Sequence, residues 1–213
     1  TGSDDQEVQV VGDLSLDIDR VYITWKSMPI DLTLTEFWIV NALAKRPGHV
    51  KTREQLMDDA NLDMWLLISR EYNEDPVLKT MLPSTWLNAR RRTIIVFYRN
   101  KEKQTIERLA VARYDIGKSI KSAWNKEKEP NQWKALSDII AERNPEKIGV
   151  NYSKHFPLAD GLVKTDYEEL TQNLPDSLTS KLVSAEKLAV AWVETRTEKE
   201  IQLFEKLVKI THD

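Results

Sequence analysis

The sequence contains no cysteine, and only three of its 213 residues are histidine: His49, His155 and His212. A chain without cysteine can form no disulfide scaffold, thiol nucleophile or cysteine-ligated zinc site. The histidines are widely separated, so each is interpreted as a surface or capping residue and not as a metal ligand. The motifs GxGxxG, HExxH and GxSxG and the Walker loop are absent too, which leaves nucleotide binding and the commoner hydrolase mechanisms without support. We therefore expect no cofactor.

Long apolar runs are also missing. No stretch approaches the roughly 18 consecutive apolar residues of a membrane-spanning helix. The segment Thr1–Asp5 is too polar for a signal peptide, and residues 1–10 are predicted to be a tag or a disordered lead. We expect a soluble protein that does not contact membranes and resides in the cytoplasm.

The charged residues are nearly balanced in number but unevenly distributed. The chain has 31 basic and 34 acidic residues, and its apolar share of 41% is enough for the core of one large domain or two small ones. Residues 1–62 contain 6 basic and 11 acidic residues, whereas the rest contains 25 and 23. Because a DNA-binding module presents a basic surface to phosphates, this acidic start argues against nucleic acid as the partner of residues 1–62 by themselves.

The first part of the chain changes from an alternating to a helical period. Alternating apolar residues within Val8–Lys26 predict two antiparallel strands, and Met28–Leu32 predicts a third short strand that Pro29 confines to a sheet edge. A stripe at helical spacing then predicts a helix that ends at Arg46–Gly48. The stripe consists of Leu34, Phe37, Trp38, Val40, Asn41, Leu43 and Ala44. The capping box Thr52–Gln55 predicts the start of a second helix.

The segment LTLTEFWIVNALAKRPGHVKTREQLMD and the strands before it resemble the C-terminal winged-helix effector domain of OmpR/PhoB-type response regulators over residues 11–58. The resemblance implies a small sheet, two helices and a basic third helix that enters the DNA major groove. That third helix is missing here, because an apolar strand predicted from Asp63 follows at once, and the receiver domain is absent from the sequence as well. Residual contact with a DNA backbone is expected at most from Thr52 and Arg53, and we do not expect sequence-specific DNA binding.

The rest of the chain alternates strand and helix patterns. Three predicted strands, which we expect to form one sheet, are Asp63–Ser69, Arg92–Tyr98 and Ile106–Val111. A further strand is predicted at Lys147–Asn151. Helical patterns occur at Asn131–Ile140, through residues 160–162 and 167–170, at Ala185–Val190 and at Thr197–His212. The order indicates an α/β fold.

Four phrases of this second part resemble, in their order and spacing, the N-terminal creatinase/prolidase-like domain of pita-bread metallopeptidases such as Xaa-Pro aminopeptidases. They are DMWLLISREYNEDPVLKTMLPSTWLNARRRTIIVFY, KIGVNYS, LADGLVKTDYEEL and WVETRTEKEIQLFEKLVKITHD. The resemblance implies an α/β fold with a mixed sheet flanked by helices. In that family this domain shapes the substrate entrance and contributes to subunit contacts. The chemistry belongs to a following domain, where two Asp, one His and two Glu hold a dinuclear metal centre. Those ligands are absent here, so we expect the chain as it stands not to be an enzyme.

The two resemblances meet between Arg53 and Leu62. The letters REQLMDDANLDMWLL fit both the second helix of the first family and the helix that precedes the first strand of the other. We interpret the chain as a chimera, engineered or recombined, with a lead at residues 1–10, a truncated winged-helix segment at 11–58 and an α/β domain at 59–213. Because an isolated core below about 60 residues is marginal, we expect the first segment to pack on the larger domain or on a second copy of the chain. A homo-oligomer, such as a dimer that exchanges the N-terminal element, is therefore expected.

Three functions from different classes remain open. The favoured one is a non-catalytic domain that shapes a substrate entrance and holds subunit contacts. A DNA-binding regulator of the winged-helix class is supported by residues 11–58 alone. An active metal-dependent aminopeptidase would require the missing catalytic domain to be supplied by another chain.

The strongest basic cluster is formed by Arg90, Arg91 and Arg92, which follow Trp86. With Trp86 and Tyr98 expected nearby, such a cluster could bind a phosphate or a substrate carboxylate. The alternative, a solvated entrance to the strand that begins at Arg92, is favoured.

Two further charged segments have simple interpretations. A basic segment around Trp124 could form a nucleic-acid-binding face, but Glu127 and Glu129 dilute its charge and a solvated helix is favoured. Its basic residues are Lys118, Lys121, Lys126 and Lys128. Glu74 and Asp75 lack a partner base, so a loop role is favoured over acid–base chemistry.

Overall fold

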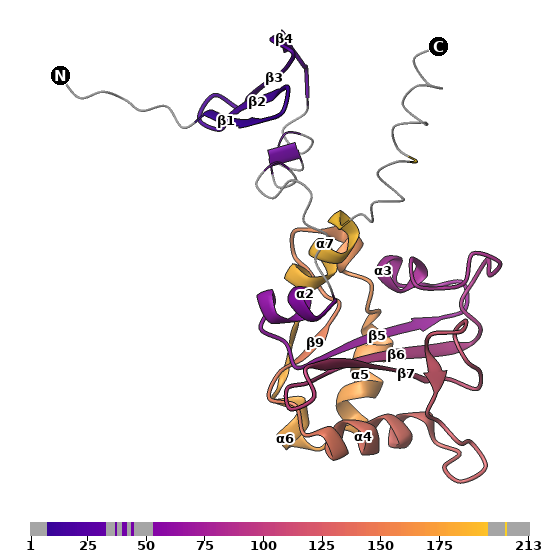
Figure 1. The fold of residues 1–213 in the computed structure, drawn as a ribbon. Helices are drawn as coiled ribbons and strands as arrows, with labels where there is room; N and C mark the ends of the chain where they lie inside the picture. The colour runs from indigo at the N-terminus through magenta and orange to yellow at the C-terminus, as the bar shows by residue number, and fades with distance from the viewer. Residues whose placement is uncertain are drawn as a thin grey trace. The chain divides into compact units, whose positions relative to one another are not determined.

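The computed structural model describes residues 8–32, 37, 40, 41, 44, 53–195 and 203 (Figure 1). The chain divides into two compact units, the first comprising residues 1–50 and 196–213 and the second residues 51–195. The second unit therefore begins at residue 51, earlier than the boundary between residues 58 and 59 that was predicted from the sequence. Within the described residues, no helix is long and apolar enough to cross a membrane.

The first unit contains a four-stranded antiparallel sheet in the order β1-β2-β3-β4. Its strands are β1 (Val8–Val11), β2 (Leu14–Asp17), β3 (Tyr22–Trp25) and β4 (Met28–Pro29). The prediction of two strands within residues 8–26 was wrong, because Gly12, with a φ of 60°, allows an additional turn. Residues 8–10, which were assigned to the lead, form the start of β1.

The core of the first unit lies between the sheet and a helical segment. Leu16 and Ile23 face each other across β2 and β3, and both are buried against Phe37 and Ala44. Phe37, Val40, Asn41 and Ala44 are helical, with the i, i+3, i+4, i+7 spacing that the sequence predicted. The other residues of that predicted helix, including its end at 46–48, lie outside the described residues.

The second unit contains a six-stranded mixed sheet in the order β10-β9-β5-β6-β7-β8. Its strands are β5 (Met64–Arg70), β6 (Arg92–Asn100), β7 (Thr105–Val111), β8 (Lys121–Ser122), β9 (Ile148–Val150) and β10 (Leu182–Ser184). The first three lie in one sheet, as the sequence predicted, and form an antiparallel meander; β9 and β10 continue the sheet in parallel to β5. The expected α/β fold with a mixed sheet is confirmed.

Helices cover both faces of this sheet. They are α2 (Arg53–Asp59), α3 (Pro76–Lys79), α4 (Gln132–Arg143), α5 (Lys164–Asn173), α6 (Asp176–Thr179), α7 (Glu186–Glu194) and the 3-10 turn η1 (Pro157–Ala159). Figure 1 shows α4, α5 and α6 on one side of the sheet and α2, α3 and α7 on the other. The strand β5 supplies both cores, with Trp65 and Leu67 directed to one and Leu66 and Ile68 to the other. An unbroken apolar run is the pattern expected of such a doubly covered strand.

Two helix predictions in the second unit require correction. The helix expected through residues 160–162 begins only at Lys164, after the turn η1 and Gly161. The solvated helix expected around Lys118–Lys128 does not form. Instead, β8 is followed by a turn in which the Asn125 side chain accepts hydrogen bonds from the backbone amides of Glu127 and Lys128. Asn side chains compete with helix formation in this way. The helix expected over 197–212 lies outside the described residues except for Leu203.

A buried polar chain ties α3 to the sheet. Asp75 is fully buried, and its Oδ1 accepts hydrogen bonds from the backbone amides of Val77 and Leu78 at the start of α3. Its Oδ2 accepts a bond of 2.8 Å from Asn151 Nδ2, and Asn151 Oδ1 accepts one of 2.8 Å from Trp65 Nε1. Burial raises the pKa of Asp75, and these donors oppose the rise. Asp75 is thus a helix cap within the core, which agrees with its predicted loop role.

Replacing Gly161 by alanine should lower the free energy of unfolding by about 1–3 kcal/mol, because the new Cβ would overlap the carboxylate of Asp75 and lie 2.9 Å from the Asp75 Cα. Urea unfolding measures the change. Thr165→Ala, at an exposed position of α5, is the matched control and should change stability by less than about 0.5 kcal/mol. Equal stability of Gly161→Ala and the unmodified chain would show that the loop does not pack closely on Asp75.

A bidentate ion pair connects α4 to β7. Arg143, in the last turn of α4, donates from Nε to Glu107 Oε2 at 2.6 Å and from Nη2 to Oε1 at 3.1 Å. These hydrogen bonds hold the pKa of Glu107 below its usual value. A depressed carboxyl pKa means that the stabilisation is present above the unfolded-state pKa and disappears as the pH falls through the folded-state pKa.

Glu107→Gln should therefore destabilise the protein by about 0.5–1 kcal/mol at pH 7, a small value because the carboxylate is partly exposed to water. The difference from the unmodified chain should shrink as the pH falls below the ordinary glutamate pKa of about 4.3 and through the lower pKa of the folded state. Unfolding midpoints measured across this pH range test the expectation, and a difference that does not depend on pH would contradict it.

Candidate anion-binding site

The three arginines singled out in the sequence lie where β5 ends and β6 begins. Arg92 is the first residue of β6 and pairs in register with Arg70, the last residue of β5. Arg91 has a φ of 53°, and its carbonyl accepts a hydrogen bond of 2.8 Å from the Glu71 amide. The Arg91 amide in turn donates to Glu71 Oε2 at 3.3 Å. These bonds fasten the loop before β6 to the end of β5.

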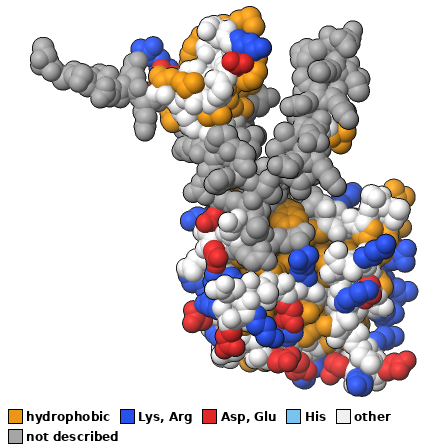
Figure 2. Space-filling model, in the orientation of Figure 1, with side chains coloured by type: hydrophobic (Ala, Val, Ile, Leu, Met, Phe, Trp, Pro, Cys, Tyr) orange, Lys and Arg blue, Asp and Glu red, His pale blue; other side chains and the backbone are white. Residues whose placement is uncertain are grey.

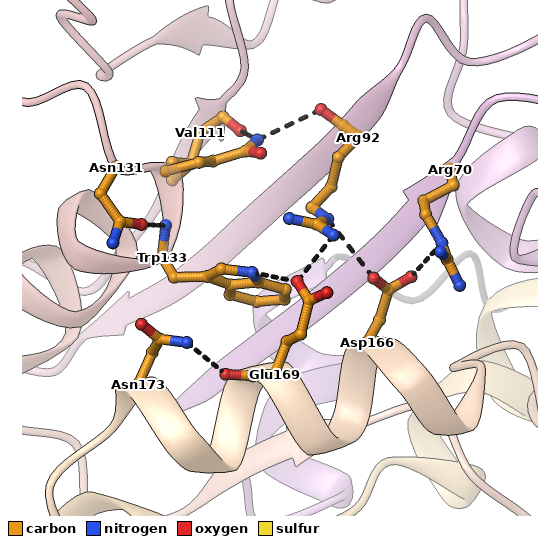
Figure 3. Close-up of polar contacts among 9 residues, drawn as sticks. Arg70, Arg92, Val111, Asn131, Trp133, Asp166, Glu169 and Asn173 are labelled. Carbon is orange, nitrogen blue, oxygen red and sulfur yellow. Dashed lines mark hydrogen bonds and ion pairs between the residues drawn. The ribbon is translucent and has the colours of Figure 1, made fainter.

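Arg70 and Arg92 are neutralised by two acids of α5 (Figure 3). Arg70 Nε lies 3.1 Å from Asp166 Oδ2, and Arg92 Nε lies 3.3 Å from Asp166 Oδ1. Arg92 Nη2 also lies 2.7 Å from Glu169 Oε2. The Asp166 side chain is completely buried; burial raises its pKa, and the two guanidinium groups oppose the rise. The four charges compensate one another.

Arg92 is held from the α4 side as well. Its guanidinium carbon lies 4.7 Å from the centre of the Trp133 ring, and Trp133 Nε1 donates a 2.5 Å hydrogen bond to Glu169 Oε2. Gln132 Nε2 donates to the carbonyl oxygens of Arg92 and Val111, at 3.2 and 2.6 Å. Figure 3 shows these residues converging between the sheet, α4 and α5. Arg92 therefore connects three elements of the core.

Arg90 has a different environment. Its guanidinium carbon lies 4.8 Å from the centre of the Trp86 ring, which meets Tyr114 edge-on at 5.5 Å. The Tyr114 hydroxyl donates to the Arg90 carbonyl oxygen and shares a 2.6 Å hydrogen bond with Thr93 Oγ1. Burial raises the pKa of Tyr114, so the hydroxyl keeps its proton. We call Arg90, Trp86 and Tyr114 the arginine shelf.

The cationic charge of the shelf is not compensated by the described residues. Neither Arg90 nor Arg91 forms an ion pair with any residue that the structure describes, and both are exposed. Figure 2 shows Lys and Arg side chains gathered along the side of the second unit where β5 ends and β6 begins in Figure 1. A planar guanidinium stacked on a ring retains in-plane N–H groups that suit the paired oxygens of a carboxylate or phosphate.

Thr52 and Arg53, the residues predicted to contact a DNA backbone, are not among the residues of this site. Thr52 lies outside the described residues, and Arg53 is described only as the first residue of α2. The helix α2 itself buries Leu56 and Met57 in the core of the second unit. Contact with DNA at these two residues stays a prediction.

A pocket of about 460 Å³ between the loop after β9 and the start of α7 is lined by two serines, a histidine and a glutamate, among other residues. The Ser153 hydroxyl donates to Glu186 Oε2 at 2.5 Å and accepts hydrogen bonds from the backbone amides of His155 and Phe156. Its contacts thus anchor the loop to α7. Among the described residues, no group of three or more acids and histidines is arranged to bind a metal ion.

The sequence identified the arginine cluster and its neighbour Trp86. It did not identify the acids that pair with Arg92 and leave Arg90 in a different environment. Asp166 and Glu169, three residues apart on one helix face, were a detectable acidic pair, yet nothing in the sequence linked them to Arg92. Tyr98, expected near the cluster, lies toward the other end of β6, where its hydroxyl donates to the Arg143 carbonyl oxygen. Comparison with known proteins adds no further assignment, because no protein-family model and no solved structure matches the chain.

Arg92→Ala should lower the free energy of unfolding by about 2–4 kcal/mol, because it removes a cation from a buried carboxylate and leaves Asp166 under-compensated. Arg90→Ala is the matched variant from the same triplet and should cost no more than about 1 kcal/mol, the loss of an exposed cation–π contact. Urea unfolding of both variants tests the contrast. Equal losses of unfolding free energy would mean that the contacts of Arg92 with α5 stabilise the protein no more than the stacking of Arg90 on Trp86 does.

Proposed function

We propose that the second unit is a non-catalytic α/β domain of the creatinase/prolidase N-terminal type, which shapes a substrate entrance and holds subunit contacts. In this proposal the chain is chimeric or recombined, with part of a response-regulator effector domain before the α/β domain. The observation that carries the proposal is the mixed sheet covered by helices on both faces, the architecture that the resemblance implied.

The contacts of the buried acids in the second unit support a scaffold role. Asp75 caps α3, and Asp166 joins α5 to β5 and β6. Asp63 Oδ2 accepts hydrogen bonds from the backbone amides of Glu146 and Lys147, at 3.0 and 3.1 Å, and its Oδ1 lies 2.9 Å from Lys101 Nζ. Each acid is committed to holding elements together, which is the use expected of buried charges in a structural domain.

A surface for subunit contacts is available on the loop after β9. Tyr152, Phe156 and Leu158 are 42%, 49% and 60% exposed, three large apolar side chains within seven residues. Burial of such side chains is the usual driving force of association. We assign this surface to a contact with a second copy of the chain, consistent with the subunit contacts that the resemblance implies.

A second candidate function is DNA binding by the first unit. The observation that favours it is the helical segment with Phe37 and Ala44 packed on a four-stranded sheet, as the winged-helix resemblance implies. The excess of acidic residues in this part of the chain opposes it. Binding to duplex DNA that weakens steeply with salt would support this alternative over the first.

The proposed function predicts no hydrolysis of an Xaa-Pro peptide by the purified full chain supplied with Mn²⁺ or Zn²⁺. It also predicts a dimer that Phe156→Ser combined with Leu158→Glu converts to a monomer, because a charge and a hydroxyl replace apolar contacts. Leu87→Glu, a change at another exposed apolar residue, should leave the dimer intact. Peptide release measured by chromatography and mass measured by light scattering test these expectations.

Metal-dependent turnover that follows the protein through purification would contradict the non-catalytic role and favour the aminopeptidase alternative. A monomeric unmodified chain would contradict the subunit contact.

A further inference from the structure

We propose that the arginine shelf is a binding site for a carboxylate group of a peptide. The inference rests on the proposed function only in taking a peptide as the ligand. Arg90 and Arg92 belong to one triplet and both stack on tryptophan, at 4.8 and 4.7 Å. Arg92 has two carboxylates of its own chain, whereas Arg90 has none among the described residues. Both arginines are therefore stacked on a tryptophan, but only Arg92 also binds carboxylates of the chain, and Arg90 has no described carboxylate partner.

Glu71 and Glu74, two acids of the loop after β5, are bound by backbone amides beside the shelf. Glu71 Oε2 accepts the hydrogen bond from the Arg91 amide, and Glu74 Oε1 accepts bonds from the amides of Tyr72 and Ala89, at 3.2 and 3.0 Å. The Ala89 and Arg91 amides, on either side of Arg90, thus hold both carboxylates at the loop before β6, and neither carboxylate forms an ion pair with Arg90 among the described residues. An external carboxylate would therefore not have to displace an ion-pair partner of Arg90 from the described residues.

The shelf is also ordered by its own contacts. Trp86 is supported by Tyr114, and the Tyr114 hydroxyl is bound by Thr93 and by the Arg90 backbone. The pairing of Arg91 with Glu71 determines the course of the chain on the other side of Arg90. A side chain already stacked on a ring loses less conformational entropy when it binds, so its contacts contribute more to affinity.

Exposed apolar side chains next to the shelf favour a peptide over a small inorganic anion. Leu87 is 87% exposed and lies three residues before Arg90 in the same loop. Tyr72 is 80% exposed, has a φ of 67°, and follows Glu71, which is bonded to Arg91. This φ suits the third position of the tight turn Arg70–Asn73, which the Asn73 amide closes by donating to the Arg70 carbonyl oxygen, so only the exposure of the ring bears on ligand binding. Leu87 and Tyr72 would contact the apolar part of the ligand.

The test measures binding of three peptides to the full chain by calorimetry. The first is acetyl-Ala-Pro-Leu with a free C-terminal carboxylate, the second is its C-terminal amide, and the third is acetyl-Ala-Glu-Leu amide, which carries only a side-chain carboxylate. We expect the amide without an acid to bind at least tenfold more weakly than either carboxylate peptide. The order of the first and third peptides identifies the source of the carboxylate. Equal binding of all three would overturn the proposal.

Variants locate the site. Arg90→Ala should weaken binding of the better carboxylate peptide at least tenfold, and Arg90→Lys should restore only part of it, because an ammonium group is neither planar nor bidentate. Arg108→Ala, on β7, removes an equal charge and should leave binding within twofold. Circular dichroism and the unfolding midpoint establish that each variant is folded. Equal weakening by Arg90→Ala and Arg108→Ala would reduce the effect to net charge and overturn the site.

Inorganic phosphate is the competing ligand. If phosphate competes with the peptide and binds more tightly than the peptide does, the shelf is a phosphate site. The assignment to a peptide carboxylate is then wrong. Because these measurements record binding and not turnover or oligomeric state, a negative result would leave the proposed scaffold function standing. Likewise, turnover or a monomeric state would contradict the proposed function but not the arginine shelf, which the binding titrations test separately.

Discussion

The second unit depends on the burial of β5 from both sides. Trp65 and Leu67 enter one core and Leu66 and Ile68 the other, so neighbouring strands must supply apolar residues in register on each face. Every polar group that approaches this strand then needs a partner, because water is excluded. The hydrogen-bonded chain from Trp65 through Asn151 to Asp75 satisfies this requirement on one face.

The end of β5 imposes a second requirement, which concerns charge. Register places Arg70 beside Arg92, and two guanidinium groups in this position would repel each other without an acid between them. The helix α5 supplies Asp166 and Glu169, so the start of α5 and the end of the sheet are stabilised together. Two residues earlier, Arg90 stacks on Trp86 without a described carboxylate. Stability and ligand binding thus use the same side-chain type in one short segment.

Much of this fold could be predicted from local pattern. The apolar runs of β5 and β6 have few alternatives, and Asn131 before α4 and Asn144 after it are ordinary helix boundaries. The helix expected around Lys118–Lys128 did not form because Asn125 binds the backbone of the turn. The late start of α5 follows from the approach of Gly161 to Asp75, residues that are far apart in sequence. The sequence located the candidate site at Arg90–Arg92 but could not show that Arg92 is paired with acids of α5 whereas Arg90 is exposed.

The sequence by itself determined the class of the protein: alternating and helical periods require an α/β chain with a β-rich start, and the absence of cysteine excludes thiol and disulfide chemistry. Tertiary structure alone decided which charged residues stabilise the fold and which remain open to a ligand. The physical reason is that period and capping depend on neighbours within a few residues. The partner of Arg92 is instead chosen by the packing of α5 against a strand more than sixty residues away in the chain.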